Sequence, residues 1–163
     1  MPLARLAKPL LLLIALACIA MLGVGLYLQL VLDMLPCPLC IMQRYAFMKV
    51  AVLCLIALAL PTSAMRIFAG LGSLAAIGGA GIAIRHLWVK AHPTVSCGID
   101  PLETLLNKLP FANWYPPLFQ ADGLCTTEYA PILGLSIPQW ALAWFVVFAI
   151  ATALVAWRGG RSA

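Results

Sequence analysis

The stretch CPLCIMQRYAFMKVAVLCLIALAL, residues 37–60, joins two cysteines and an arginine to a long apolar segment. Its apolar part, 41–60, has the roughly 20 residues that an α-helix needs to cross about 30 Å of hydrocarbon. Charged groups are costly next to lipid, and those that occur there usually serve a function. The stretch therefore predicts a membrane helix with one chemically active end.

The rest of the chain has the composition of a membrane protein. Of its 163 residues, 64% are hydrophobic and 9% are charged, whereas soluble domains have about 25% charged residues. The segments long enough to span a membrane are 10–30, 41–60, 67–89 and 137–157. We expect the first to be a true span, because its apolar run is longer than that of a cleaved signal peptide. The connections between the first three spans are short, which favours an up-down four-helix bundle formed by one membrane domain, 1–163.

The charged residues predict the orientation of this bundle. Basic residues occur without acidic ones at both ends of the chain and between spans two and three; they are Arg5, Lys8, Arg66, Arg158 and Arg161. The acidic residues all lie in the other two connections, 31–40 and 90–136. Basic flanks stay in the cytoplasm, so both termini are expected there. The net charge of +5 is then a signal of topology and not of nucleic-acid binding.

The large outer connection carries the pattern of a short helix. Asp100-Pro101-Leu102-Glu103 supplies an N-cap, a proline at the first helical position and a capping-box glutamate. Leucines follow at helical spacing up to Leu109. We predict a helix with its leucine face in the membrane interface, the alternative being a helix packed on top of the bundle. Trp114 and Tyr115 fit an interfacial aromatic belt.

Position divides the six cysteines into two groups. Cys18 and Cys54 lie inside spans, where a free thiol behaves as a small apolar side chain. The others lie on the outer side, where a bacterium keeps thiols oxidised; they are Cys37, Cys40, Cys97 and Cys125. These four allow three pairings. A pair formed by the C-x-x-C cysteines suits a reactive disulfide and leaves Cys97 to pair with Cys125.

Two other uses of Cys37 and Cys40 stay open at this point. The pair could be a structural staple, although so small a loop contributes little entropy. It could also bind a soft metal. No third ligand is evident, since only His92 is near and neither loop has a cluster of histidines or methionines. We therefore favour redox chemistry and expect no metal.

The residues around Cys40 strengthen the redox interpretation. Cys40 begins a helix and Arg44 follows one turn later, and both features favour a thiolate. The chain has no nucleotide-binding glycine motif and no haem or flavin motif, so a lipid quinone is the remaining electron acceptor. His86, at the outer end of span three, could donate to a quinone carbonyl or carry its proton, or be an ordinary interfacial histidine. Lys49 is expected to reach the membrane surface or to pair within the bundle.

Three motifs resemble the disulfide bond formation protein B (DsbB) family of bacterial inner-membrane thiol:quinone oxidoreductases. They are CPLCIMQRYAF, the RH that ends span three, and FQADGLCTTEYAPILGLSIPQW at 119–140. The resemblance implies that Cys37–Cys40 faces the quinone and that Cys97–Cys125 exchanges with another protein. It also implies that Arg44 and His86 are quinone-site residues. Gln43 stands where better-known members have glutamate, so no proton role is carried over to it.

The resemblance also implies where and with what the protein acts. It places the bundle in the bacterial inner membrane, with the large loop and active site on the periplasmic side. The expected partners are the periplasmic thioredoxin-fold oxidase DsbA and the membrane quinone pool, with ubiquinone preferred and menaquinone as the alternative. The rival functions are a soft-metal transporter that uses Cys37 and Cys40 and a non-catalytic membrane scaffold.

Overall fold

Four long helices make up most of the computed structural model, which describes residues 3–92, 94 and 102–158. They are α1 (Leu3–Val31), α2 (Pro38–Ala59), α3 (Thr62–Ala91) and α7 (Ile137–Arg158). The parts of these helices long and apolar enough to cross a membrane are Leu6–Val31, Pro38–Ala59, Thr62–Ala91 and Ile137–Trp157. The predicted all-α bundle with four spans is therefore confirmed, and the helix bounds differ from the predicted ones by a few residues.

Local sequence explains where α2 begins and ends. Cys37 is its N-cap and accepts a hydrogen bond from the backbone N–H of Cys40, and Pro38 occupies the first turn, where its missing N–H costs nothing. At the other end Leu60 is extended, with φ −99° and ψ 157°. A residue that precedes a proline, here Pro61, is pushed out of the helical region. The C-x-x-C motif thus lies in the first turn of α2.

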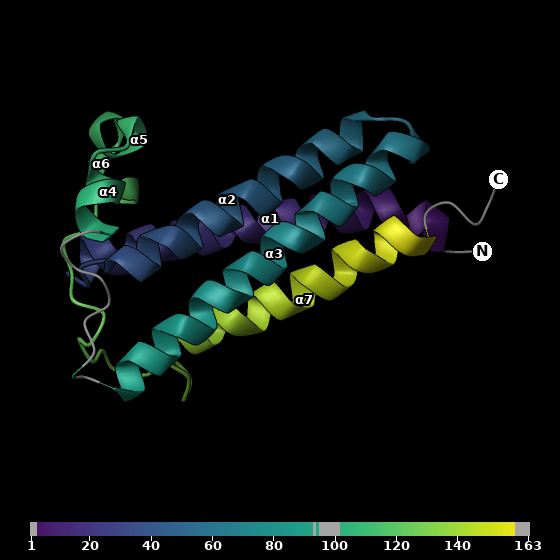
Figure 1. The fold of residues 1–163 in the computed structure, drawn as a ribbon. Helices are drawn as coiled ribbons and strands as arrows, with labels where there is room; N and C mark the ends of the chain where they lie inside the picture. The colour runs from purple at the N-terminus through teal and green to yellow at the C-terminus, as the bar shows by residue number, and fades with distance from the viewer. Residues whose placement is uncertain (1–2, 93, 95–101, 159–163) are drawn as a thin grey trace.

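The four long helices are not packed evenly around the bundle. The helix α3 lies between α2 and α7 and contacts both along its length, and α1 packs mainly on α2. Contact between α1 and α7 is slight. Figure 1 shows the start of α1, the α2–α3 turn and the end of α7 at one end of the bundle. Toward the other end, α1 and α7 both line a cavity.

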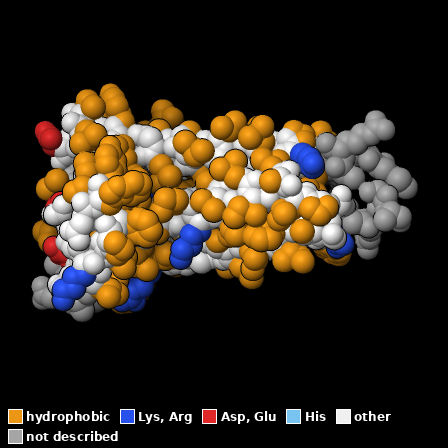
Figure 2. Space-filling view, turned by 90° about the horizontal axis from the view of Figure 1, so that it is seen from above, with side chains coloured by type: hydrophobic (Ala, Val, Ile, Leu, Met, Phe, Trp, Pro, Cys, Tyr) orange, Lys and Arg blue, Asp and Glu red, His pale blue; other side chains and the backbone are white. Residues whose placement is uncertain are grey.

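Apolar side chains cover the outside of the long helices, as Figure 2 shows, with the acidic side chains of this face near the end opposite the two termini. Inside, Cys18 and Cys54 are fully buried free thiols in the main core, as small apolar side chains would be. Lys49 is exposed on α2. Its position fits a lysine that extends along the helix surface toward water.

Three short helices lie at the end of the bundle opposite the termini (Figure 1). They are α4 (Thr104–Asn107), α5 (Pro110–Trp114) and α6 (Pro116–Phe119). The predicted loop helix, which ended at Leu109, is shorter in the structure, where α4 ends at Asn107. Two helices that were not predicted follow it, and Pro110 and Pro116 occupy their first turns, where a missing N–H costs nothing. The predicted cap, Asp100 and Pro101, lies outside the described residues.

The leucine face of the loop is divided. Leu106 is buried with Ile41 and Ala121, and Leu102 and Leu109 pack against the same cluster. Leu105 and Trp114, by contrast, are 61% and 81% exposed. Most of the leucine face thus packs on top of the bundle, which was the alternative considered for it. The exposed aromatic and leucine side chains remain suited to a membrane interface.

Small residues in α3 allow the close packing of α7. Gly79 lies directly under the ring of Phe145, so that a Cβ at this position would overlap that ring. Phe145 is fully buried and stacks on Phe47 of α2 with 4.0 Å between ring centroids. Ser73 of α3 donates to the carbonyl oxygen of Ala149 at 2.9 Å. The glycine brings three helices together at one level of the core.

We predict that Gly79→Ala destabilises the bundle relative to Gly78→Ala. The added Cβ at 79 must displace Phe145, and such overpacking costs about 1–3 kcal/mol. At Gly78 nothing lies within 4 Å of an added Cβ, and both variants gain the same helix propensity. Unfolding in detergent, followed by circular dichroism, measures the difference. Equal free energies of unfolding would contradict the prediction.

Candidate redox site

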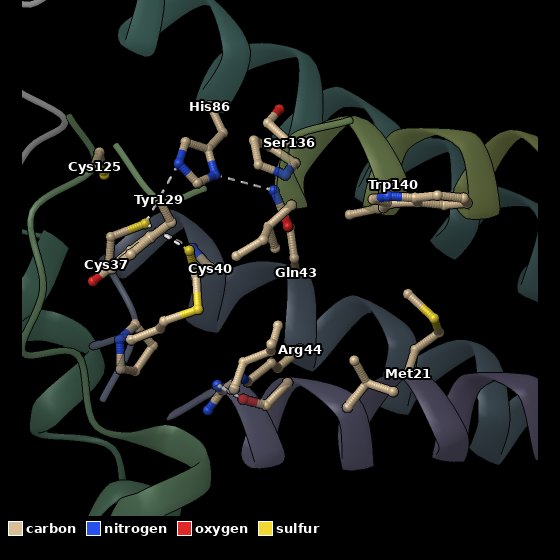
Figure 3. Close-up of a pocket in the computed structure, with 18 of the residues that line it drawn as sticks. Met21, Cys37, Cys40, Gln43, Arg44, His86, Cys125, Tyr129, Ser136 and Trp140 are labelled. Carbon is tan, nitrogen blue, oxygen red and sulfur yellow. Dashed lines mark hydrogen bonds between the residues drawn. The ribbon is translucent and has the colours of Figure 1, made fainter. Parts of the chain in front are cut away.

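A cavity of about 250 Å³ lies at the loop end of the bundle, between α1, α2, α3 and α7. Figure 3 shows Cys40, Gln43 and Arg44 on one wall and His86 facing them. Its apolar wall comes from α1 and α7 and includes Met21, Leu22, Trp140 and Trp144. The structure thus brings the C-x-x-C motif, Arg44 and His86 to one cavity.

The C-x-x-C cysteines form a close pair of thiols. Cys37 Sγ donates to Cys40 Sγ at 2.9 Å, and both cysteines are free in this structure. The hydrogen bond to Cys40 and burial raise the pKa of Cys37, so Cys37 keeps its proton. Cys40 is the hydrogen-bond acceptor, lies in the first turn of α2 and faces the cavity. Because a thiolate is favoured at a helix N-terminus, Cys40 is the sulfur set up to act as nucleophile.

His86 contacts the cysteine pair directly. Its Nε2 lies 3.7 Å from Cys37 Sγ, and its Nδ1 lies 3.4 Å from Nε2 of Gln43. The ring is 4% exposed. An amide on one ring nitrogen orients the ring and fixes which nitrogen faces the sulfur. Sequence reasoning gave Gln43 no role, although its position one turn after Cys40 was a usable signal.

Arg44 of α2 lines the cavity and also forms hydrogen bonds to two other helices, α1 and α6. Its guanidinium donates to Gln29 Oε1 at 2.9 Å and to the Gly25 carbonyl oxygen at 3.1 Å, both in α1. It also donates to the carbonyl oxygens of Pro117 and Leu118 in α6, each at 3.2 Å. None of these acceptors in the described part of the chain is a carboxylate. The positive charge beside the cavity is therefore solvated by neutral groups and is not cancelled.

The second cysteine group approaches the first through Cys125. Cys125 is disulfide-bonded and 2% exposed, and it packs with Cys37 and Val89 in one buried cluster. Cys97, its predicted partner, lies outside the described residues. The predicted pairing therefore remains a prediction, while the described residues bring Cys125 against the C-x-x-C pair.

Backbone contacts hold the Cys125 segment in this position. The backbone N–H groups of Asp122 and Gly123 donate to the Pro36 carbonyl oxygen at 3.1 and 3.0 Å. A Cβ at Gly123 would overlap the backbone of Leu35. Asn107 adds a reciprocal pair of hydrogen bonds with the backbone of Ala121. A glycine is thus required where the loop lies on the residues that precede Cys37.

The structure corrects one expectation about metal ligands. The ligand atoms of Cys37, Cys40 and His86 all lie within 4.8 Å of one another. Sequence reasoning found no third ligand because His86 is 46 positions beyond Cys40 in the chain and only the fold brings them together. His92, the histidine considered there, is exposed and bonded to the Trp88 carbonyl oxygen.

A four-span helical bundle with a C-x-x-C dithiol at one end and a disulfide packed beside it defines a class of protein. It is a membrane-embedded thiol–disulfide oxidoreductase, in which one cysteine pair can exchange with the other.

Comparison with known proteins gives the family. The profile of the family described as "Disulfide bond formation protein DsbB" matches residues 7–155. The chain is 59% identical over 144 residues to disulfide bond formation protein B of Herminiimonas arsenicoxydans, covering 88% of this chain and 91% of that protein. It is 47% identical over 154 residues to disulfide bond formation protein B 1 of Pseudomonas putida, covering 94% and 92%. The chain belongs to the DsbB family of disulfide-forming membrane oxidoreductases.

We predict that Arg44→Met loosens the loop. The substitution removes every hydrogen bond that the guanidinium makes to α1 and α6, so segment 102–136 should open more often and be cut several-fold faster by an added protease. Arg44→Lys should be intermediate, because an ammonium cannot replace the planar fork. Lys49→Met, which removes an exposed cation from the same helix, is the matched control. Cleavage rates measured by mass spectrometry that match in Arg44→Met and Lys49→Met would refute the role.

Proposed function

We propose that this protein reoxidises a periplasmic dithiol oxidase of the DsbA type and passes the electrons to a membrane quinone. One observation carries the proposal: the disulfide-bonded Cys125 packs against Cys37, and Cys40 of the same couple faces an apolar cavity. Electrons that enter the loop disulfide therefore have a short route to the membrane side. The proposed site of action is the periplasmic face of the bacterial inner membrane, with both termini in the cytoplasm, as the basic flanks favour.

The proposed relay starts at the loop. A thiolate of the partner attacks the Cys97–Cys125 disulfide, and because Cys125 is buried the attack falls on Cys97. This forms a mixed disulfide with Cys97 and releases the Cys125 thiolate. The partner's second thiol then displaces Cys97, which leaves the partner oxidised and the loop pair reduced.

The second exchange transfers the electrons to the C-x-x-C couple. The Cys125 thiolate attacks Cys37 in the oxidised couple, forming Cys37–Cys125 and releasing the Cys40 thiolate at the cavity. Cys97 then attacks Cys125, which restores the loop disulfide and leaves Cys37 as a thiol. The raised pKa of Cys37 favours the proton on that sulfur and the negative charge on Cys40. The sum is one oxidised partner and one reduced couple, with no net change in the loop.

The cavity suits a lipid quinone. A quinone supplies an acceptor for two electrons and two protons, and it consists of a flat ring with two carbonyls on an apolar tail. The cavity has an apolar wall from α1 and α7 and few polar groups, of which Arg44 offers a fixed positive charge to oxygens that become negative. His86, hydrogen-bonded to Gln43, is placed to hold or move a proton at Nε2 beside Cys37. We propose ubiquinone as the acceptor, with menaquinone as the alternative.

The direction of transfer agrees with general redox energetics. A DsbA-type oxidase has a potential near −120 mV, so only a still more oxidising acceptor can take its electrons. Each 30 mV of difference is worth about 1.4 kcal/mol for a two-electron couple. A membrane quinone is the proposed acceptor, and the Cys37–Cys40 couple, whose potential must lie between the two, carries the electrons to it.

We predict that Cys97→Ser abolishes oxidation of DsbA while a small apolar dithiol still reduces quinone through Cys37 and Cys40. The reason is that the loop pair is the proposed docking couple and the C-x-x-C pair the proposed quinone couple. Purified protein is assayed with reduced DsbA and, separately, with ubiquinone and menaquinone analogues. Normal oxidation of DsbA by Cys97→Ser would refute the two-step relay, and a lack of quinone-dependent turnover in the unmodified protein would refute the function.

We predict that Gly123→Ala slows oxidation of DsbA by about 10- to 100-fold, because a shift of about 1 Å in reacting groups has effects of that size. The added methyl overlaps the backbone before Cys37, so the Cys125 segment must move away from its target. Reduction of quinone by a small dithiol should be unchanged. Glu128→Ala, an exposed change in the same segment, is the control. If Gly123→Ala and Glu128→Ala oxidise DsbA equally fast, the close approach is unimportant.

A further inference from the structure

We propose that the reduced cysteine couple and His86 form a binding site for a thiophilic divalent cation of the zinc group. The site consists of Cys37 Sγ, Cys40 Sγ and His86 Nε2, and it exists only while the couple is a dithiol. The inference needs no partner protein and no quinone, so it stands apart from the proposed function.

The positions of the donor atoms support the site. Tetrahedral zinc has Zn–S near 2.3 Å and Zn–N near 2.0–2.1 Å, which puts two sulfurs about 3.8 Å apart and a sulfur and a nitrogen about 3.5 Å apart. Here the sulfurs are 2.9 Å apart, and Nε2 is 3.7 Å from Cys37 Sγ. The nitrogen is thus near its place relative to Cys37, and all three donor atoms lie within 4.8 Å of one another. The two sulfurs need to separate by roughly 1 Å, by this geometry.

The surroundings of His86 hold its ring in place. Gln43 Nε2 lies 3.4 Å from Nδ1, and the ring is buried, so Nε2 stays directed at Cys37. Because an amide NH2 group can only donate, Nδ1 accepts in this contact and the ring proton lies on Nε2. Binding of a cation at Nε2 therefore requires this proton to move to Nδ1 and the amide to turn its oxygen toward it. The donors come from two helices, α2 and α3, whose packing fixes their separation. All three donor residues line the cavity, so a water molecule held there could supply a fourth ligand.

Charge also favours capture by the dithiol form. Arg44 and Lys90 line the cavity and oppose an isolated cation. Two thiolates and one divalent cation are neutral together, so the complex does not bury a net charge. Binding displaces the thiol proton of Cys37, since Cys40 is the thiolate of the reduced couple, and it transfers no electrons. The disulfide form offers no thiolate, so oxidation of the couple and binding of the cation exclude each other.

The consequence for the enzyme is inhibition that depends on its redox state. A cation bound to both sulfurs prevents the disulfide from forming, so the couple cannot pass on its electrons until the cation leaves. Zinc or cadmium should therefore block turnover and a chelator should restore it. Protein whose couple is already oxidised should be unaffected until its first reduction.

The test uses the full chain in detergent with Cys97→Ala and Cys125→Ala, so that the loop thiols cannot bind metal. Cadmium chloride is titrated into the reduced, quinone-free protein without oxygen, and the ultraviolet thiolate-to-cadmium absorption and the bound cadmium are measured. We expect one cadmium per chain in the reduced form and none after oxidation of the couple. Cadmium bound equally by both forms would overturn the site, and this comparison needs no change at His86.

The histidine is tested with a matched pair in the same background. His86→Ala should weaken binding by at least about 10-fold, the lower limit for disturbing a metal site. His92→Ala, which removes the exposed histidine at the end of α3, should leave it unchanged. Equal affinities for the two variants would remove His86 from the site. Dithiol-to-quinone turnover is measured separately on metal-free protein: turnover without cadmium binding refutes only the metal site, and cadmium binding without turnover refutes only the proposed function.

Discussion

The loop end of this bundle depends on the solvation of one buried guanidinium. Arg44 is 8% exposed, and removing such a charge from water is unfavourable unless hydrogen bonds replace the water. Carbonyl and amide oxygens of α1 and α6 supply them. The α6 part of the loop must therefore lie beside Arg44. Loop residues that follow α6, among them Leu124, Cys125 and Tyr129, line the cavity beside the C-x-x-C pair.

Packing within the bundle determines which helices form the apolar wall of the cavity. The helices α2, α3 and α7 are held closely by small residues such as Gly79, and α1 joins mainly through α2. Contact between α1 and α7 is slight, and both helices line the cavity that Cys40 faces.

Much of this architecture could be predicted from local sequence. The apolar lengths gave the four spans and the C-x-x-C motif the reactive pair, because each depends on neighbouring residues. Pro38 and Pro61 limit α2 and were local signals of the same kind that the prediction did not use. Contacts between distant residues were not accessible: the position of His86 on Cys37, the approach of Gly123 to Leu35 and the acceptors around Arg44 arise from helix packing. The short helices that begin at Pro110 and Pro116 were not predicted, although a proline at the first helical position was a usable signal.

The apolar cavity wall supplied by α1 and α7 has a consequence for how the supply of the proposed acceptor should be described. A lipid quinone that reaches this wall from the bilayer stays within the hydrocarbon throughout its exchange, so its effective concentration is a mole fraction in lipid and not a molarity in water. Added lipid or detergent then dilutes the acceptor even when the total amount in the sample is unchanged. Rates measured on different preparations of this protein can therefore be compared only at the same ratio of quinone to lipid. In a membrane, this ratio takes the place of the substrate concentration.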